Sequence, residues 1–306
     1  MLPDAAEVVE VSPRDGLQNE GRPVGTADKL RLIEAMIAAG AKRIEATSFV
    51  HPGRVPQMAD AEAVMAGLPR TPGVTISGLV LNRRGAERAI AAGCDELTYT
   101  VCASEAFGQR NQGQTVEQGL LVWAEVAAMA RAAGRRATVM IATAFGCPFE
   151  GAVDPARVED MARQVLRSGP AEIGLADTIG VGTPRQVVDL FGRVQAAVNS
   201  AGTGRASMRA HFHNTRNTGY ANAYAALLAG ATVLDSSAGG IGGCPFAPRA
   251  TGNIATEDLL FLLDGIGVRH GIDRGAVAAL DPWLAEVLGH AVPGQLGKTD
   301  AWPPAL

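Results

Sequence analysis

The feature that most constrains the fold is a short junction that recurs along the chain, in which a helical stretch ends at glycine and an apolar run follows. Its four clearest copies contain Gly40, Gly93, Gly169 and Gly230. Glycine suits the end of a helix because it accepts the left-handed conformation without a Cβ clash. The repeated order of helix, glycine and strand predicts an α/β protein of alternating helices and strands.

Eight short apolar runs fit parallel strands that are covered on both faces. They lie at residues 6–11, 42–47, 74–80, 96–101, 137–142, 172–176, 207–213 and 232–237. Helical patterns separate them, most clearly at 28–39, 115–133, 155–167, 184–199 and 218–229. Units about 32 residues long, repeated eight times, need roughly 250 residues, the usual size of a (β/α)8 barrel. An open doubly wound sheet is the alternative, but eight units without a phosphate-binding fingerprint favour the barrel.

The length of 306 residues allows either two modest domains or one large barrel. No linker, charge block or low-complexity tract divides the chain. We therefore expect one domain over residues 1–306. A (β/α)8 TIM barrel would occupy residues 1–255, and a short C-terminal helical extension residues 256–306.

Composition excludes several classes of protein. A net charge of −4 gives no electrostatic footprint for nucleic acid. The apolar stretch 120–133 is interrupted by Glu125 and Arg131, so it does not predict a membrane span. The first residues include Asp4 and Glu7 and lack the features of an export signal. The four cysteines are too few for a disulfide scaffold, so we expect a reduced cytoplasmic protein.

Polar residues gather where the predicted strands end. In a (β/α)8 barrel, the loops at the carboxyl ends of the strands carry the chemistry. The polar segments there are 12–20, 45–49, 177–178, 211–214 and 235–237, and a glycine-rich segment at 239–245 follows the last strand. The polar groups therefore converge on one rim of the barrel.

Two histidines at this rim indicate a metal site. His211 and His213 alternate with an aromatic residue, so on a strand both imidazoles point to the same side. Asp15 lies at a matching strand end. Oxygen and imidazole ligands without thiolates favour Mg²⁺ or Mn²⁺ over structural Zn²⁺. In the alternative interpretation, one histidine caps a hydrogen-bond network and the other is a neutral core residue.

Three charged residues at the rim have two interpretations each. Arg14, in a turn bounded by proline and glycine, is either a fixed guanidinium aimed at developing negative charge or half of a surface ion pair. Glu45 and Asp177 are either site residues or carboxylates that hold arginine or lysine inside the barrel.

The tetrapeptide Gly-Cys-Pro-Phe occurs twice, at 146–149 and 243–246. Either cysteine, Cys147 or Cys244, can be a reactive group or a buried small hydrophobe. The glycines before Cys244 indicate a loop that bends or closes, as lids do, which slightly favours Cys244 as the reactive one.

Taken together, these motifs resemble those of the 3-hydroxy-3-methylglutaryl-CoA lyases (HMG-CoA lyases). The matching segments occur in family order: SPRDGLQNE at 12–20, EATSFV at 45–50, VPQMAD at 55–60, GCPFEG at 146–151, DTIGVGTP at 177–184, GGCPFA at 242–247 and TGNIATEDL at 251–259. The resemblance covers nearly the whole chain. These lyases belong to a larger group of metal-dependent (β/α)8 enzymes that includes isopropylmalate and homocitrate synthases.

The resemblance implies a role for each site residue. Asp15, His211, His213 and Asn253 would hold a divalent cation, Mg²⁺ or Mn²⁺. Arg14 would stabilise the enolate oxygen of departing acetyl-CoA, and Cys244 would act in proton transfer. Glu45 and Asp177 would complete the polar pocket, and Gln18 would bind substrate with Arg14. Asp15 and Asp177 both remain candidates for the base that removes the hydroxyl proton.

The implied activity is retro-Claisen cleavage of 3-hydroxy-3-methylglutaryl-CoA (HMG-CoA) to acetyl-CoA and acetoacetate, a reaction of leucine catabolism, by a homodimer or larger homo-oligomer. Asn214 stands where many members carry aspartate, and segments 216–219 and 248–250 also depart from the animal enzymes. A lyase for a related 3-hydroxyacyl-CoA with a different C3 substituent is therefore an alternative. A Claisen-condensing synthase is more remote, because the Gly-Gly-Cys-Pro loop resembles the lyases. An inactive acyl-CoA sensor would not need the complete residue set.

Overall fold

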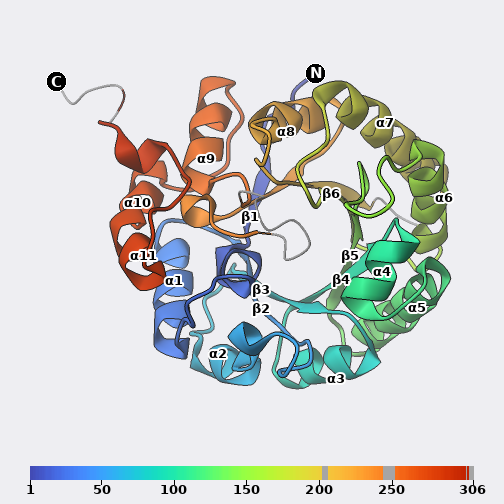
Figure 1. Cartoon of the computed structure of the whole chain (residues 1–306), viewed down its shortest axis with the longest axis horizontal. Helices are drawn as coiled ribbons and strands as arrows, with labels where there is room; N and C mark the ends of the chain where they lie inside the picture. The colour runs from blue at the N-terminus through green and yellow to red at the C-terminus, as the bar shows by residue number, and fades with distance from the viewer. Residues whose placement is uncertain (202–205, 244–251, 301, 303–306) are drawn as a thin grey trace.

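Eight parallel strands form a closed barrel in the computed structural model, which describes residues 1–201, 206–243, 252–300 and 302. Each strand pairs with the next one, and β8 pairs with β1 to close the ring (Figure 1). The strands are β1 (Glu7–Glu10), β2 (Arg43–Ser48), β3 (Thr75–Val80), β4 (Glu96–Cys102), β5 (Arg136–Ala142), β6 (Glu172–Asp177), β7 (Ser207–Phe212) and β8 (Val233–Ser236). The predicted (β/α)8 fold is confirmed.

Helices surround the barrel on its outside, except that the short one at Glu105–Gln112 lies inward of this ring and contributes to the cavity at the rim (Figure 1). They are α1 (Thr26–Ala38), α2 (Ala61–Gly67), α3 (Arg83–Ala91), α4 (Glu105–Gln112), α5 (Val116–Ala132), α6 (Pro155–Leu166), α7 (Pro184–Ser200) and α8 (Gly219–Leu228). The sequence pattern identified α1 and α5 to α8. It did not single out α2, α3 and α4, which have seven to nine residues and therefore show too few turns for a clear period.

The four junction glycines all have the left-handed conformation that their position predicts. At Gly40, φ is +107° and an added Cβ would lie 2.5 Å from the carbonyl oxygen of Gly271. Glycine is therefore required there both by the backbone conformation and by the close approach of the C-terminal part of the chain.

The strands alternate between the helical layer and the barrel interior, and β7 shows this most clearly. Met208, Ala210 and Phe212 belong to the hydrophobic core, and the Phe212 ring lies 6.4 Å from that of Phe191 in α7. Arg209 and His211 occupy the opposite face and make ion pairs inside the barrel. The apolar half of each strand thus attaches the helices, and the other half brings charged groups to the barrel axis.

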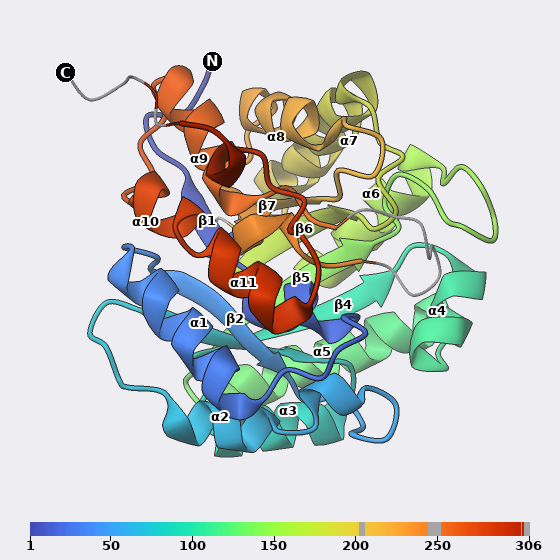
Figure 2. The ribbon, with the colours of Figure 1, turned by 60° about the vertical axis from the view of Figure 1, so that its left-hand side comes forward.

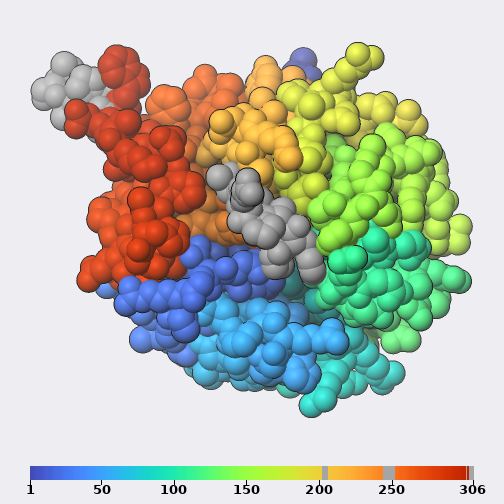
Figure 3. Space-filling model, in the orientation of Figure 1, coloured from blue at the N-terminus to red at the C-terminus, as the bar shows by residue number. Residues whose placement is uncertain are grey.

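The C-terminal part continues with α9 (Thr256–Gly265), α10 (Arg274–Ala278) and α11 (Asp281–Leu288). Figures 1 and 2 show α11 beside α1, and in the space-filling view of Figure 3 the red C-terminal surface borders the blue N-terminal one. The Arg31 guanidinium lies 4.5 Å from the centre of the Trp283 ring, and Arg22 donates to the carbonyl oxygen of Glu286. Of the helices in the described residues, none is long and apolar enough to cross a membrane.

Candidate active site

A cavity of about 450 Å³ opens at the carboxyl ends of the strands. The sequence-predicted residues that line it are Arg14, Asp15, Gln18, Glu45, His211 and His213. They come from the turn after β1, from β2 and from the end of β7. The predicted convergence on one rim is therefore confirmed for these six residues.

Asp15, His211 and His213 form a cluster that can hold a metal ion. One ligand atom of each lies within 4.8 Å of the other two. The Nε2 atoms of His211 and His213 lie 3.9 and 3.8 Å from Oδ2 of Asp15. Both imidazoles face the same side of β7, as the two-residue spacing predicts, and their ring centres are 5.2 Å apart.

Asn253 extends this cluster from the segment after β8. It pairs with His213 in an isolated bridge, and its Nδ2 donates to Asp15 Oδ2 at 2.9 Å and to the carbonyl oxygen of Ile241 at 3.2 Å. Its Oδ1 is buried and has no hydrogen-bond partner among the described residues. Two imidazoles, a carboxylate and an orphaned amide oxygen fit a divalent cation of the Mg²⁺ or Mn²⁺ type.

Electrostatics keep the Asp15 carboxylate in the protonation state that a metal needs. Burial alone would raise the pKa of Asp15, but Arg14 and the two histidines hold that pKa well below its usual value. Asp15 is therefore an anionic ligand throughout the neutral range. His211 donates from Nδ1 to Oδ2 of Asp235 at 3.0 Å, so Nε2 is the nitrogen that faces Asp15. Burial opposes it, but this hydrogen bond and the charge of Asp15 raise the pKa of His211, so a metal at Nε2 would displace a proton.

Arg14 is held over the cavity by two carboxylates. A π-helical turn, Ser12–Gly16, carries both Arg14 and Asp15. The guanidinium donates from Nη1 to Asp15 Oδ1 at 2.5 Å and from Nε to Oε1 of Glu45. The other oxygen of Glu45 is buried without a hydrogen-bond partner in the described residues. Arg14 is thus a fixed cation at the pocket wall, not half of a surface pair.

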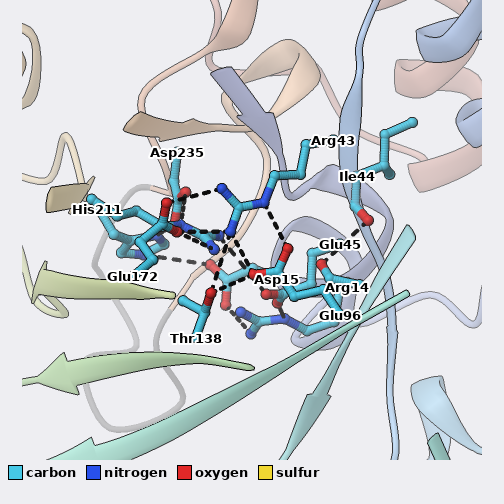
Figure 4. A network of polar contacts seen from close by, with 12 residues as sticks. Arg14, Asp15, Arg43, Ile44, Glu45, Glu96, Thr138, Glu172, His211 and Asp235 are labelled. Carbon is cyan, nitrogen blue, oxygen red and sulfur yellow. Dashed lines mark hydrogen bonds and ion pairs between the residues drawn. The ribbon is translucent and has the colours of Figure 1, made fainter. Parts of the chain in front are cut away.

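A charged network continues from these residues down the barrel interior (Figure 4). Arg209 pairs with Asp235 and Glu172, and Arg43 pairs with Glu172 and Glu96. The groups joined by ion pairs are the guanidiniums of Arg14, Arg43, Arg136 and Arg209 and the carboxylates of Glu7, Asp15, Glu45, Glu96, Glu172 and Asp235.

With four guanidiniums and six carboxylates, this network carries two unbalanced negative charges when its two histidines, His211 and His213, are neutral. A divalent cation at Asp15 would neutralise them. The charge balance is thus a second observation, beside the donor set, that fits a divalent metal.

The sequence pattern places Asp235 at the rim without indicating a role for it, and it does not identify Arg209, Arg43, Glu96 or Glu172. The available signal was the two-residue strand period. Arg209 precedes His211 by two positions and therefore shares its inward face. Which carboxylate each arginine meets depends on the register between strands, and a single sequence does not reveal that register.

The predicted site residue Asp177 stands apart from the described cavity wall. Asp177 is fully buried and is not among the described cavity-lining residues. Its carboxylate accepts from the backbone N–H groups of Val181 and Gly182 at 2.9 and 2.8 Å, which fixes the turn after β6. Burial raises the pKa of Asp177. Cys244 lies outside the described residues.

Cys147, in the other copy of the tetrapeptide, is buried. Its Sγ lies 2.9 Å from the hydroxyl oxygen of Ser104 and accepts from the backbone N–H of Phe149. Gln18 lines the cavity, and its buried Oε1 has no partner in the described part of the chain. Gln18 therefore has a free acceptor, whereas the Cys147 sulfur is already engaged.

Comparisons with protein families, curated proteins and solved structures all indicate the same family. The HMGL-like family model matches residues 5–282. The chain is 41% identical to the (R)-citramalyl-CoA lyase of Chloroflexus aurantiacus over 305 residues, which is 96% of this chain and 95% of that protein. It is 43% identical to the 3-hydroxy-3-isohexenylglutaryl-CoA/hydroxy-methylglutaryl-CoA lyase of Pseudomonas aeruginosa over 288 residues, 94% of each chain.

The solved structure of an HMG-CoA lyase from Acinetobacter baumannii in complex with coenzyme A and 3-methylmalate superposes with a TM-score of 0.92. It is 38% identical, and the match covers 99% of this chain and 97% of that one. Together with the full-length sequence matches, this shows that the chain belongs to the HMGL-like family.

Proposed function

We propose that this carbon–carbon lyase cleaves HMG-CoA to acetyl-CoA and acetoacetate with the help of a divalent cation. The observation that supports this most directly is the cluster of Asp15, His211 and His213, with the unpartnered Asn253 oxygen beside it. The fixed guanidinium of Arg14 lies next to this cluster at the same cavity. The curated HMG-CoA lyase relatives support the reaction. The relative solved with coenzyme A supports an acyl-CoA substrate.

The reaction removes the C3 hydroxyl proton and breaks the C2–C3 bond. The hydroxyl oxygen becomes the ketone of acetoacetate, and the bond electrons pass into the thioester as an enolate. Protonation at C2 then yields acetyl-CoA. The protein must therefore accept one proton, stabilise one developing oxyanion and return one proton.

The cation would be held by Asp15, His211, His213 and Asn253. When bound, it supplies a Lewis acid that lowers the pKa of the substrate hydroxyl. Arg14 stabilises the enolate oxygen, since its guanidinium is held rigidly by Asp15 and Glu45 and needs little reorganisation as charge develops. Gln18 offers its unpartnered oxygen to the substrate.

Proton transfer needs a base and an acid. Of the two candidate bases, Asp15 is favoured on geometry, because Asp177 is not among the described cavity-lining residues and its oxygens accept backbone N–H groups. Cys244, from the loop that resembles the lyases, donates the proton to the nascent carbanion. This assignment rests on the resemblance and on the engaged state of Cys147.

The second candidate substrate is (R)-citramalyl-CoA, which would give acetyl-CoA and pyruvate. The 41% identity to a citramalyl-CoA lyase over 96% of this chain favours it. The departures at Asn214 and in the turn after it also lie near the site, because the Asn214 backbone N–H donates to the carbonyl oxygen of Gly252, next to Asn253. The acyl group is therefore what the decisive experiment must resolve.

The remaining parts of the proposal rest on the sequence pattern and on the family resemblance. The whole chain forms one catalytic domain, with the barrel over residues 1–255 and the extension over 256–306. The ion is Mg²⁺ or Mn²⁺, the protein acts in the cytoplasm in leucine degradation, and it assembles as a homodimer or larger homo-oligomer.

The test is a panel of 3-hydroxyacyl-CoA thioesters incubated with the purified protein and Mn²⁺, with products identified by mass. Acetoacetate formed from HMG-CoA with the highest kcat/KM supports the proposal. A higher kcat/KM for (R)-citramalyl-CoA, with pyruvate as product, establishes the second candidate. Absence of acetyl-CoA release from every thioester contradicts the lyase activity.

A further inference from the structure

A single buried arginine lies between the two halves of the site. The Arg209 side chain is 1% exposed and belongs to β7, two residues before His211. Its Nε donates to Oδ1 of Asp235 at 2.5 Å. The other oxygen of that carboxylate accepts from His211 Nδ1 at 3.0 Å. Arg209 is thus linked to the cluster of Asp15, His211 and His213 through one intervening group, the Asp235 carboxylate.

The same guanidinium faces the support of Arg14. Its Nη2 lies 3.9 Å from Oε2 of Glu45, the oxygen that has no hydrogen-bond partner in the described residues. The opposite oxygen of Glu45 accepts from Arg14 Nε. Arg209 is therefore next to both carboxylates that orient the working groups, Asp235 for His211 and Glu45 for Arg14.

The position of Asp235 depends on this arginine. Asp235 is 3% exposed, and the hydrogen bonds recorded for its side chain in the described residues are those with Arg209 and His211. A buried carboxylate with no cationic partner is costly and shifts to find one. Carboxylates that bind the outer nitrogen of a metal-binding histidine fix its ring orientation and tautomer.

We propose that Arg209 is a positioning residue that aligns the metal-binding histidine and the enolate-stabilising arginine together, through Asp235 and Glu45. This inference rests on the proposed function, since it assigns a divalent cation to the Asp15 cluster. It adds a residue that touches neither the cation nor the substrate and that acts through two others.

An electrostatic role and a positioning role predict opposite changes in cation affinity when Arg209 is removed. Loss of a buried positive charge near a cation site, taken alone, strengthens cation binding. Loss of the group that holds Asp235 leaves His211 free to turn, which weakens cation binding. The sign of the change in affinity therefore separates the two effects.

Arg43 provides a matched control. It is an equally buried arginine of the same network, at 1% exposure. It binds Glu96 and Glu172 and has no recorded contact with Asp235 or Glu45 among the described residues. Arg43→Met removes the same charge without touching the supports of the site.

The experiment measures Mn²⁺ affinity of the full chain by electron paramagnetic resonance, without substrate. Arg209→Met should weaken binding about 10- to 100-fold, the usual effect of losing an outer-shell partner, whereas Arg43→Met should leave binding unchanged or tighter. Arg209→Lys keeps the charge but serves one carboxylate at a time, so it should restore part of the loss. It also carries the test if Arg209→Met does not fold.

Histidine ¹⁵N chemical shifts give a readout without any metal. In the wild type and in Arg43→Met, His211 should be the tautomer protonated at Nδ1, and Arg209 variants should show a mixture. Unchanged or tighter Mn²⁺ binding in Arg209→Met, equal weakening in Arg43→Met, or an unaltered His211 tautomer overturns the proposal. A wild-type chain that binds no Mn²⁺ while its His211 tautomer still depends on Arg209 contradicts the proposed function but not the positioning.

Discussion

The two ends of the barrel interior use the same residue types in opposite ways. At the N-terminal end, Arg43, Glu96, Thr138 and Glu172, here called the lower cluster, satisfy one another. Arg43 donates from Nε, Nη1 and Nη2. Thr138 donates to Glu96. None of the side-chain atoms of these four residues is among the buried unpartnered atoms of the described chain.

The upper cluster, Arg14, Asp15, Glu45, His211, His213 and Asn253, is equally charged but incomplete. Glu45 Oε2, His213 Nδ1 and Asn253 Oδ1 are buried without hydrogen-bond partners within the described chain. Buried polar groups normally find partners, so such orphaned atoms indicate a ligand. The lower cluster, whose groups satisfy one another, links the strands of the barrel, whereas the upper cluster has free polar atoms for a ligand.

The largest expected effect concerns the two copies of the Gly-Cys-Pro-Phe tetrapeptide. Cys244→Ser should lower kcat for acetyl-CoA release by about 10²- to 10⁴-fold, the usual contribution of a positioned proton donor. Cys147→Ser should retain most activity, because its sulfur is buried and already bonded to Ser104 and the Phe149 backbone. Steady-state kinetics of both variants provide the check, and the reverse order would mean that Cys147 is the donor.

Substitution of Arg14 tests the upper cluster directly. Arg14→Met should lower kcat by about 10²- to 10³-fold, as for loss of one oxyanion donor, with a much smaller change in KM. A guanidinium that acts on the enolate contributes in the transition state and little to ground-state binding. Kinetics with the best thioester of the panel give both constants. A change confined to KM would instead assign Arg14 to substrate binding.

Substitution of Arg43 tests the lower cluster. Arg43→Met leaves Glu96 and Glu172 as buried carboxylates with a missing partner, so the free energy of unfolding should fall by about 3–5 kcal/mol. Catalytic constants of the folded fraction should remain near wild type. Urea unfolding monitored by circular dichroism measures the loss. A stable variant with impaired kcat would show that the two clusters do not have separate roles.

Glu257 offers the smallest effect. It is fully buried, its Oε2 accepts from the Gly239 backbone, and its Oε1 is unpartnered in the described structure. Burial, together with Asp281, raises its pKa from 4.5 to about 8. The folded state therefore holds a proton that the unfolded chain releases, and this stabilisation is present in full below pH 4.5 and lost as the pH rises through 8.

Glu257→Gln mimics the protonated form and should remove this pH dependence. The variant should melt a few degrees above the wild type at pH 9, and the two should melt together at pH 4. Thermal unfolding across this pH range provides the check. Parallel melting curves would indicate that Glu257 is ionised in the folded protein.

The sequence predicted the barrel and the convergence of Asp15, His211 and His213 for a clear physical reason. Glycine after each helix marks the repeat, and a two-residue strand period places His211 beside His213. It did not predict the clusters beneath them, because Arg43, Arg209 and Asp235 lie in short strands that read as apolar. Their partners come from other strands, through the register of the barrel. Asp177 does lie at the carboxyl end of β6, as the sequence predicts. The turn after β6 folds back, however, and its backbone N–H groups donate to the Asp177 carboxylate.

The most direct test of the account is whether the upper cluster binds the cation that cleavage needs. The protein is stripped with a chelator and titrated with Mn²⁺ while bound metal and acetyl-CoA release are followed together. We expect one Mn²⁺ per chain, activity that returns in proportion, loss of both in His213→Ala, and retained metal binding in Arg43→Met. Turnover that survives complete metal removal would contradict the central claim.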